Sequence, residues 1–338
     1  MTSDAPLAGR RVGLVLGAGG MIGHAYHAGV LAALEDQLGW DARDASLIVG
    51  TSAGSVVGSI LRAGIGARDL AARSTGEPLS PEAAHLVARS EAATPAGPPL
   101  RPRRARGLPR MAAPGMVARA VLRPFWWNRP GVVLAGAIPA GRVPTEWVSA
   151  GIRVLYGDAW SERPLWIAAV RLGDGRRVVF GRDHGARPSV ADAVAASCAI
   201  PGFFEPVTID GERYVDGGAH SPTNADLVAT EPLDLVVVSS PMSISGAPGR
   251  RRPGIDAPAR RLCRLYLARE IARIRRRGIP VIAFQPTPDD LGVMGVNAMD
   301  PDRRAPVTRQ ARVSAATKLV RDDVQNLLRD LGRVEQPA

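Results

Sequence analysis

The sequence predicts an α/β protein with a mainly parallel central sheet. Residues 11–64 alternate between short apolar runs and segments with helical spacing of apolar residues, in the order strand, helix, strand, helix. Two strands joined by one helix lie parallel in a sheet, with a right-handed crossover. Similar alternation resumes near residue 165. With 338 residues, of which 46% are apolar, the chain can build a sizeable core.

The first half of the chain contains the clearest elements. Residues 11–16 predict a short buried strand, and residues 21–38 a helix. Residues 46–49 predict the second strand, and a second helix then runs up to Gly64. Residues 91–110 hold five prolines and five arginines with almost no apolar periodicity, so we expect an irregular, mobile surface segment there.

The second half returns to regular structure. Strands near 165–171 and 176–180 flank a Gly-Asp-Gly turn and predict a hairpin. Ser189 is placed to cap a helix that extends to Ser197, and Tyr214-Val215 precedes an Asp-Gly-Gly turn. Two further buried strands and two closing helices are expected at 233–239, 279–284, 258–277 and 306–331.

Composition and charge exclude several classes of protein. The net charge is +11, but Lys318 is the only lysine among 43 basic residues. Such a bias reflects genome composition as much as function, so we do not infer nucleic-acid binding. Cys198 and Cys263 belong to no CxxC or Cys/His cluster, which predicts two free thiols in a reducing compartment. No apolar run reaches about 18 residues and no signal-peptide pattern is present, so we expect a cytoplasmic protein.

The strongest local motif is Gly50-Thr51-Ser52-Ala53-Gly54, a G-x-S-x-G sequence between a predicted strand and a predicted helix. A nucleophile elbow needs such a sharp strand-to-helix turn to present its hydroxyl. The helix behind the serine carries partial positive charge that favours a developing anion. A serine that caps the helix in a glycine-rich turn is the alternative, and the strand–turn–helix context favours the elbow.

A second glycine-rich turn, Gly17-Ala18-Gly19-Gly20, follows the first strand and enters a helix. Its free N–H groups could cradle a dinucleotide pyrophosphate or form an oxyanion hole. The dinucleotide fingerprint G-x-G-x-x-G fails, because Ile22 occupies the third glycine position. The two strands are expected to be near neighbours, which places the glycine N–H groups beside Ser52 and favours the oxyanion role.

A nucleophilic serine also needs a base. Only His220 follows the candidate acid Asp216, and four residues is too short a separation for the usual histidine loop. An aspartate that acts directly on the serine is the simpler hypothesis. Asp216 follows a short strand, where its carboxylate can meet the sheet edge that carries Ser52, and a partly desolvated site would raise its basicity. An ordinary Asp-Gly turn is the alternative.

Taken in order, these motifs resemble the patatin-like phospholipase family. The resemblance is carried by Gly17–Gly20, Gly50–Gly54, Asp216-Gly217-Gly218 and the Ala-Ile-Pro-Gly-Phe-Phe-Glu-Pro segment at 199–206. It covers about residues 9–235, with a weaker match at 285–288. Each motif is weak by itself, and the ordered set is specific.

The resemblance implies a three-layer α/β/α fold and a Ser–Asp dyad that hydrolyses lipid acyl esters without histidine. Ser52 is then the nucleophile and Asp216 the general base, with no metal or organic cofactor. Gly19 and Gly20, with Gly17, supply oxyanion N–H groups, and the supporting motif glycines are Gly50, Gly54, Gly217 and Gly218. The glycine loop of the family usually ends with Arg or Lys before a glycine, whereas Met21-Ile22-Gly23-His24 contains neither, which bears on substrate preference.

Two segments invite a hypothesis of contact with an anionic membrane. Phe125-Trp126-Trp127 is flanked by Arg123 and Arg129, a combination that suits an interfacial patch on a lid. Burial of these aromatic side chains in the core is the alternative. Residues 258–277 contain eight arginines and one acid. They predict a surface helix with a basic face, and attraction to acidic headgroups is the sharper interpretation. Its apolar stripe consists of Cys263, Leu267, Ile271 and Ile274.

The leading hypothesis is a serine lipid acyl hydrolase whose partner is a lipid or phospholipid substrate. The sequence predicts one α/β domain over 9–330, because Ser52 and Asp216 must share a site, with an insertion or lid at about 75–150. A nucleotide-binding oxidoreductase that uses Gly17–Gly20 is one alternative. A catalytically silent lipid-binding protein of the same fold is another. No motif bears on the oligomeric state.

Overall fold

The computed structural model describes residues 6–94, 111–121, 129–185, 187–246 and 256–333. In these ranges one sheet contains eight strands in the order β5-β6-β3-β2-β1-β7-β8, and β4 pairs with β3. The strands are β1 (Val12–Leu16), β2 (Leu47–Gly50), β3 (Leu165–Arg171), β4 (Arg177–Phe180), β5 (Val207–Ile209), β6 (Glu212–Asp216), β7 (Leu235–Ser239) and β8 (Val281–Phe284).

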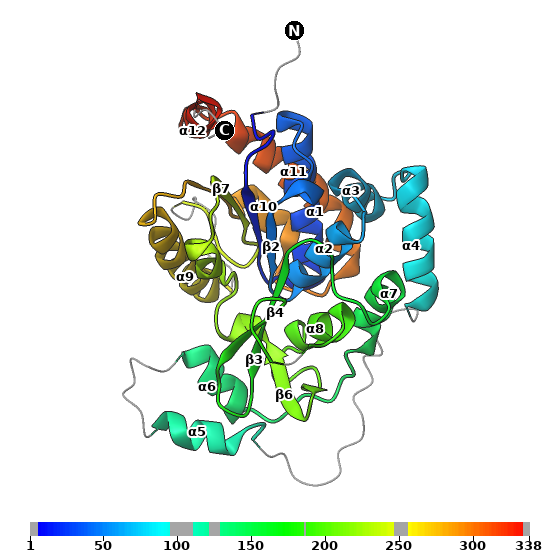
Figure 1. Ribbon diagram of the computed structural model, residues 1–338, viewed down its shortest axis with the longest axis vertical. Helices are drawn as coiled ribbons and strands as arrows, with labels where there is room; N and C mark the ends of the chain where they lie inside the picture. Colours follow the sequence, from blue (N-terminus) through cyan, green and yellow to red (C-terminus); the bar gives the residue numbers. More distant parts are fainter. Residues whose placement is uncertain (1–5, 95–110, 122–128, 186, 247–255, 334–338) are drawn as a thin grey trace.

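Helices cover both faces of this sheet (Figure 1). The α-helices are α1 (Gly20–Leu38), α2 (Ala53–Arg62), α3 (Ala67–Thr75), α4 (Pro81–Ala93), α5 (Pro114–Val121), α6 (Pro130–Ala137), α7 (Glu146–Tyr156), α8 (Val190–Ser197), α9 (Ala257–Arg275), α10 (Pro288–Met294), α11 (Arg304–Leu319) and α12 (Asp322–Arg333). Short 3-10 helices are η1 (Ala42–Asp44), η3 (Gly217–Ala219), η4 (Ala225–Thr230) and η5 (Pro301–Arg303). None of the helices in the described ranges is long and apolar enough to cross a bilayer.

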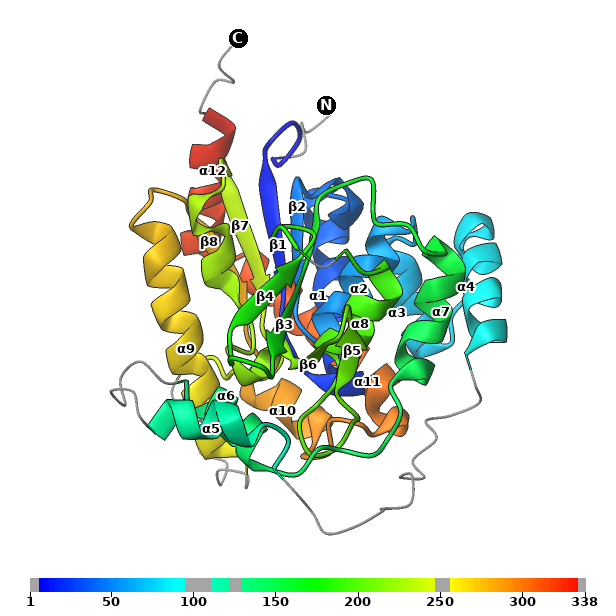
Figure 2. The same ribbon diagram turned by 60° about the horizontal axis from the view of Figure 1, so that its bottom comes forward.

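The arrangement is three-layered, as expected. Strands β3, β2, β1, β7 and β8 are parallel, and β4, β5 and β6 add antiparallel pairs. Successive residues of β1 point to opposite faces, so Leu14 and Leu16 join the core beneath α1, α2 and α11, whereas Val15 joins the core beneath α9 and η4. Figure 2 shows α9 on one side of the sheet and α1 and α2 on the other.

Local sequence signals explain why these elements start and end where they do. Gly39 ends α1 in the left-handed conformation that glycine adopts without strain, at φ 62°. The Ser189 side chain accepts from the N–H of Asp192 and caps α8, as predicted. The predicted hairpin of β3 and β4 is antiparallel. Leu267 and Ile274 of α9 are buried, so the predicted stripe does pack on the sheet.

The register of β3 brings distant motifs together. Its first residues pair with β2, so that Ile167 lies opposite Gly50. Its last residues pair with β6, so that Ala169 lies opposite Asp216. The partners of Gly50 and Asp216 are thus only two residues apart along β3. The end of β6 therefore lies close to the turn that follows β2.

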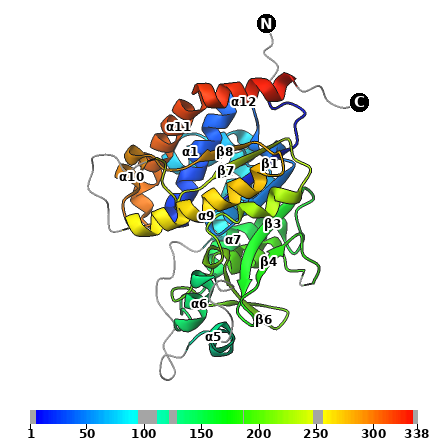
Figure 3. The same ribbon diagram turned by 90° about the vertical axis from the view of Figure 1, so that its left-hand side faces the viewer.

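Several predicted boundaries are wrong. Residues 306–331 form two helices, α11 and α12, because the chain breaks after Leu319 and acidic residues at 322 and 323 favour a new N-terminus. The insertion expected at about 75–150 contains the short helices α5 and α6, which begin at Pro114 and Pro130 because proline suits the first turn of a helix. Helices α5 and α6 lie beside each other near β6 (Figure 3). Residues 95–110 and Phe125-Trp126-Trp127 lie outside the described residues.

Candidate active site

Ser52 occupies the turn between β2 and α2. Its backbone has φ 52° and ψ −118°, a combination that costs a non-glycine residue strain energy. Such strain at a strand-to-helix turn is the mark of a nucleophile elbow. Gly54 lets α2 approach β1, because a Cβ at this position would overlap the carbonyl oxygen of Leu16. The strained strand-to-helix turn that such an elbow requires is therefore present at Ser52.

A hydroxyl from a distant helix fixes the position of this turn. The N–H of Ser52 donates to Ser197 Oγ at 2.9 Å, and that hydroxyl donates to the carbonyl of Ala168 at 2.7 Å. Ser55 Oγ donates to the carbonyl of Ser52 at 2.7 Å. Ser197 ends α8 and Ala168 lies in β3, so tertiary contacts hold the strained backbone in place.

Asp216 ends β6 and is 5% exposed. Burial raises the pKa of its carboxyl to about 6, against hydrogen bonds from the Gly218 N–H and the Ser52 hydroxyl that lower it. The Gly218 N–H lies 2.7 Å from Asp216 Oδ1. A carboxylate with this pKa is ionised at pH 7 and is more basic than an exposed aspartate. The structure thus brings together Ser52 and Asp216.

The glycine loop after β1 offers two free N–H groups. In the described part of the chain, no group accepts a hydrogen bond from the N–H of Gly19 or Gly20, which begin α1. Gly20 has φ 60°, a conformation that favours glycine. The N–H of Ala53, at the start of α2, also lacks an acceptor among these residues. The sequence reasoning missed Ala53, although the residue after a nucleophile commonly supplies such a donor.

The expectation that Gly17 also supplies an oxyanion N–H is wrong. Its N–H donates to the carbonyl of Ser239 at 2.9 Å, and the N–H of Ala18 donates to that of Pro222 at 2.7 Å. Both partners are remote in sequence, so no local pattern could reveal them. The loss of two donors also weakens the nucleotide-binding alternative.

A buried histidine fixes the glycine loop from behind. His27 Nε2 lies 2.8 Å from the carbonyl of Gly17, and Nδ1 lies 2.8 Å from Ser239 Oγ. Burial lowers the pKa of His27 to about 4, so the ring is neutral at pH 7. Because a carbonyl only accepts, Nε2 donates to Gly17 and Nδ1 accepts from the Ser239 hydroxyl. His27 is therefore occupied by the backbone of the loop.

The other histidines do not supply a triad partner. Among the described residues, no histidine hydrogen-bonds to Ser52 or Asp216. Burial lowers the pKa of His220 to about 3 and that of His24 to about 3, so both rings are neutral at pH 7. His24 lines the pocket described next.

Ser52 lies at the wall of a pocket of about 320 Å³. The lining is mostly apolar and comes from α2, α7 and the 199–206 segment: Val56, Ile60, Trp147, Val148, Ile152 and Phe204. Helices α4 and α7 flank it, so part of the predicted insertion forms a wall of this pocket. Apolar walls around a buried hydroxyl suit the acyl chain of a lipid.

Cys198 also lines the pocket but does not compete with Ser52 as a nucleophile. The two cysteines, Cys198 and Cys263, are free thiols. Burial raises the pKa of Cys198 well above its usual value, and the nearby Asp216 raises it further. A protonated thiol is a poor nucleophile, so Cys198 serves as a small apolar group of the wall.

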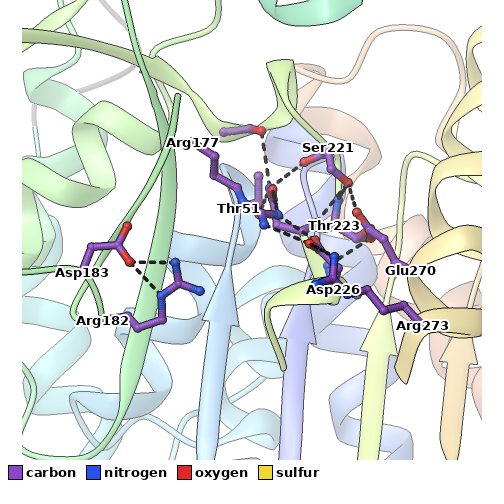
Figure 4. A network of polar contacts seen from close by, with 12 residues as sticks. Thr51, Arg177, Arg182, Asp183, Ser221, Thr223, Asp226, Glu270 and Arg273 are labelled. Atoms are coloured by element: carbon purple, nitrogen blue, oxygen red, sulfur yellow. Dashed lines mark hydrogen bonds and ion pairs between the residues drawn. The ribbon is translucent and has the colours of Figure 1, made fainter. Parts of the chain in front are cut away.

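A buried polar network joins the elbow to the Asp-Gly-Gly turn (Figure 4). Asn224 Nδ2 donates to Thr51 Oγ1 at 3.1 Å, to the Ser221 carbonyl at 2.7 Å and to the Gly217 carbonyl at 3.4 Å. Thr51 precedes Ser52 and Gly217 follows Asp216. One amide thus bridges the two loops that carry Ser52 and Asp216.

Two charged residues complete the network on either side. The Arg177 guanidinium donates to Asn224 Oδ1 at 3.1 Å and binds Asp226 through both terminal nitrogens, at 2.6 and 2.9 Å. Glu270 of α9 accepts from Ser221 and Thr223 hydroxyls, both at 2.6 Å. No sequence motif marks these residues, since they lie in different elements and meet only in the fold.

Replacing Asn224 by alanine is expected to lower the free energy of unfolding by about 2–4 kcal/mol. Asn224 is fully buried and has φ 50°, so the change removes three donated hydrogen bonds and strains the left-handed backbone. Denaturant titration measures the loss. Asn224→Gly removes the amide without adding backbone strain. Its free energy of unfolding should therefore lie between that of the wild type and that of Asn224→Ala. A loss below about 0.5 kcal/mol for Asn224→Ala would contradict the bridging role.

Comparison with known proteins agrees with these features. A family model described as "Patatin-like phospholipase" matches residues 14–229, which is more than half of the chain. This chain belongs to the patatin-like phospholipase family. The matched range contains the elbow, the glycine loop and Asp216, and it confirms the resemblance predicted from the ordered motifs.

Curated relatives of this patatin-like chain include uncharacterized NTE family proteins of Mycobacterium bovis and Mycobacterium tuberculosis. Each is 28% identical over 251 residues, which cover 73% of this chain and 54% of the relative. The chain therefore spans about half the length of the curated relatives it matches.

Solved structures similar to this patatin-like chain include VipD from Legionella pneumophila, with 14% identity and a TM-score of 0.43. That alignment covers 95% of this chain and 67% of VipD. The type III effector protein ExoU is 16% identical with a TM-score of 0.34, over 95% of this chain and 53% of ExoU. With identities and TM-scores this low, neither structure supports a conclusion about this chain beyond what its own sheet order shows.

Proposed function

We propose that this patatin-like chain is a serine lipid acyl hydrolase with a Ser52–Asp216 dyad. The observation that carries the proposal is that Ser52, in the wall of an apolar pocket, lies next to the buried carboxyl of Asp216, which is far away in sequence. Ser52 sits on a strained turn, and the Asp216 carboxyl, whose pKa burial raises, lies close enough to the Ser52 hydroxyl for that group to lower the pKa in part. Membership of a phospholipase family supports lipid hydrolysis, and the dyad is our assignment.

In the first half-reaction, Asp216 removes the proton of the Ser52 hydroxyl while Oγ attacks the ester carbonyl carbon. The carbonyl oxygen becomes an oxyanion that accepts from the free N–H groups of Gly19 and Gly20, helped by the start of α2. When the tetrahedral intermediate collapses, the C–O bond to the alcohol breaks. Asp216 returns its proton to the leaving alcohol oxygen, and an acyl-Ser52 ester remains.

In the second half-reaction, Asp216 takes a proton from water, and the resulting hydroxide attacks the acyl-Ser52 carbonyl. The same N–H groups stabilise the second oxyanion. Collapse releases the fatty acid, and the proton passes back to Ser52 Oγ. Every proton transfer thus uses residues of the site.

A fluorophosphonate probe tests the nucleophile. The wild-type protein should become labelled, and Ser52→Ala should not, because the probe bonds covalently to an activated serine oxygen. Ser59→Ala is a matched control, since it removes another buried hydroxyl from α2 and should leave labelling unchanged. Labelling that persists in Ser52→Ala would refute the assignment.

Turnover separates the hydrolase from a catalytically silent lipid-binding protein of the same fold. Short-chain 4-nitrophenyl esters report hydrolysis without the need for a membrane surface. We expect turnover by wild type that is lost in Ser52→Ala. Lipid binding without Ser52-dependent turnover of any ester would favour the silent protein.

A further inference from the structure

Arg304 is a half-buried cation in the wall of the Ser52 pocket. Within the described residues, no carboxylate forms an ion pair or hydrogen bond with its guanidinium. Desolvation lowers the pKa of Arg304, and the nearby Arg73 lowers it further. A partly desolvated guanidinium without a counterion is costly, and proteins seldom keep one without a ligand or partner.

The packing of α11 on α1 places Arg304 near the glycine loop. Thr308 Oγ1 donates to the carbonyl of Ala25 at 3.1 Å, and Gly29, one turn farther along α1, contacts Thr308 and the following turn of α11. The two helices therefore run in the same direction. One turn before Thr308 and Ala25 come Arg304 and Met21, at the start of both helices.

A backbone contact confirms this placement. The N–H of Ile22 donates to the carbonyl of Ala298 at 3.0 Å, and the same carbonyl lies against Gly20. The chain that leads into α11 thus rests on the first turn of α1. Arg304 consequently lies on the side of the pocket where the free N–H groups of the loop are found.

Two more polar groups face the same part of the pocket. Arg73 of α3 lines it and pairs with Glu91 at 2.9 Å, so its charge is compensated. His24 lines it too, and both arginines lower its pKa, which indicates that the three side chains are close. The neutral His24 ring can donate a hydrogen bond. Among the described lining residues, Arg304 has no direct carboxylate partner, because Glu91, which acts on it from a distance, is paired with Arg73.

We propose that Arg304, with Arg73 and His24, binds an anionic group of the ester substrate. The ligand chemistry is a phosphate or a carboxylate within reach of the pocket, carried on either the alcohol or the acyl side of the ester. The inference rests on the hydrolase function proposed above. It adds a preference for anionic esters over neutral ones of the same chain length.

Two pairs of soluble substrates distinguish the source of the anion. Dihexanoyl phosphatidic acid and dihexanoylglycerol differ in a phosphate on the alcohol side. Mono-4-nitrophenyl adipate and 4-nitrophenyl hexanoate differ in a carboxylate on the acyl side. Wild type should prefer the anionic member of at least one pair. Arg304→Gln should lower kcat/KM for that member by about 10- to 100-fold and change the neutral member by less than about 3-fold.

Matched variants separate anion binding from a structural role. Arg304→Lys keeps the charge and should restore part of the preference. Arg309→Gln removes an exposed arginine from the same helix. It should leave kcat/KM unchanged for both members of each substrate pair. Arg304→Gln should not lower the melting temperature, because no described partner is lost. Equal losses on anionic and neutral substrates would overturn the proposal.

Calorimetry on Ser52→Ala tests the anion site independently of hydrolysis. Dihexanoyl phosphatidic acid and adipate monoester should bind in that background, and adding Arg304→Gln should weaken binding of the preferred anion about 10-fold or more. Arg304-dependent binding, combined with no ester turnover by the wild-type protein, would support the anion site and reject the hydrolase. Binding that Arg304→Gln does not weaken would reject the anion site without affecting the proposed hydrolase function.

Discussion

Asp216→Asn is expected to reduce kcat/KM for ester hydrolysis by about 10³- to 10⁴-fold. Asparagine has nearly the same shape and keeps an oxygen that can accept from the Gly218 N–H, so the turn should survive. It cannot take the proton of Ser52, and the reaction then depends on water as the base. Steady-state hydrolysis of a 4-nitrophenyl ester measures the loss.

The pH profile gives this prediction a second readout. The ionised carboxylate is the active base, and the pKa of Asp216 is raised to about 6 by burial. In wild type, kcat/KM should therefore fall about tenfold per pH unit below that value and level off above it. This acidic limb should be absent from the residual activity of Asp216→Asn.

A matched control makes the test specific. Asp158→Asn removes a fully exposed carboxylate that does not line the Ser52 pocket and should change neither rate nor profile. Near-normal hydrolysis by Asp216→Asn, or an acidic limb that survives in it, would show that another group is the base.

Gly54→Ala is expected to lower the free energy of unfolding by about 3 kcal/mol or more. A Cβ at Gly54 would overlap the carbonyl of Leu16, which ends the central strand β1, and neither backbone can move without disturbing the sheet. Chemical denaturation followed by circular dichroism measures the loss. Any protein that still folds should show a displaced elbow and little fluorophosphonate labelling.

Gly332→Ala is the matched control for this substitution. Both glycines lie in helices, so alanine is the better helix former at each position by about 0.5–1 kcal/mol. No atom lies near a Cβ built at Gly332. The control should therefore be neutral or slightly stabilising, and a neutral result for Gly54→Ala as well would refute the close approach of α2 to β1.

The sequence carried most of the information on the parallel part of the fold. Apolar periodicity and helix-stopping glycines are local signals, and residues 11–64 and 165–197 fold as these signals predict. Errors arose where local signals compete. The apolar periodicity at 306–331 runs through the break between α11 and α12, where acidic residues at 322 and 323 begin a second helix.

The candidate site was predictable only in part, for the same reason. Ser52, Asp216, Gly19 and Gly20 stand in motifs whose order along the chain is visible in the sequence. The Gly17 N–H was misassigned because its acceptor, the Ser239 carbonyl, lies more than two hundred residues away in a neighbouring strand.

By itself the sequence determined the fold class, the family and the candidate nucleophile and base. Only the tertiary structure decided which N–H groups of the described residues lack an acceptor among them, that Asn224 joins the two loops, and that Arg304 lines the pocket. The physical reason is that motifs record local backbone requirements. Hydrogen-bond partners, burial and charge balance are set by residues that meet only when the sheet and its helices assemble.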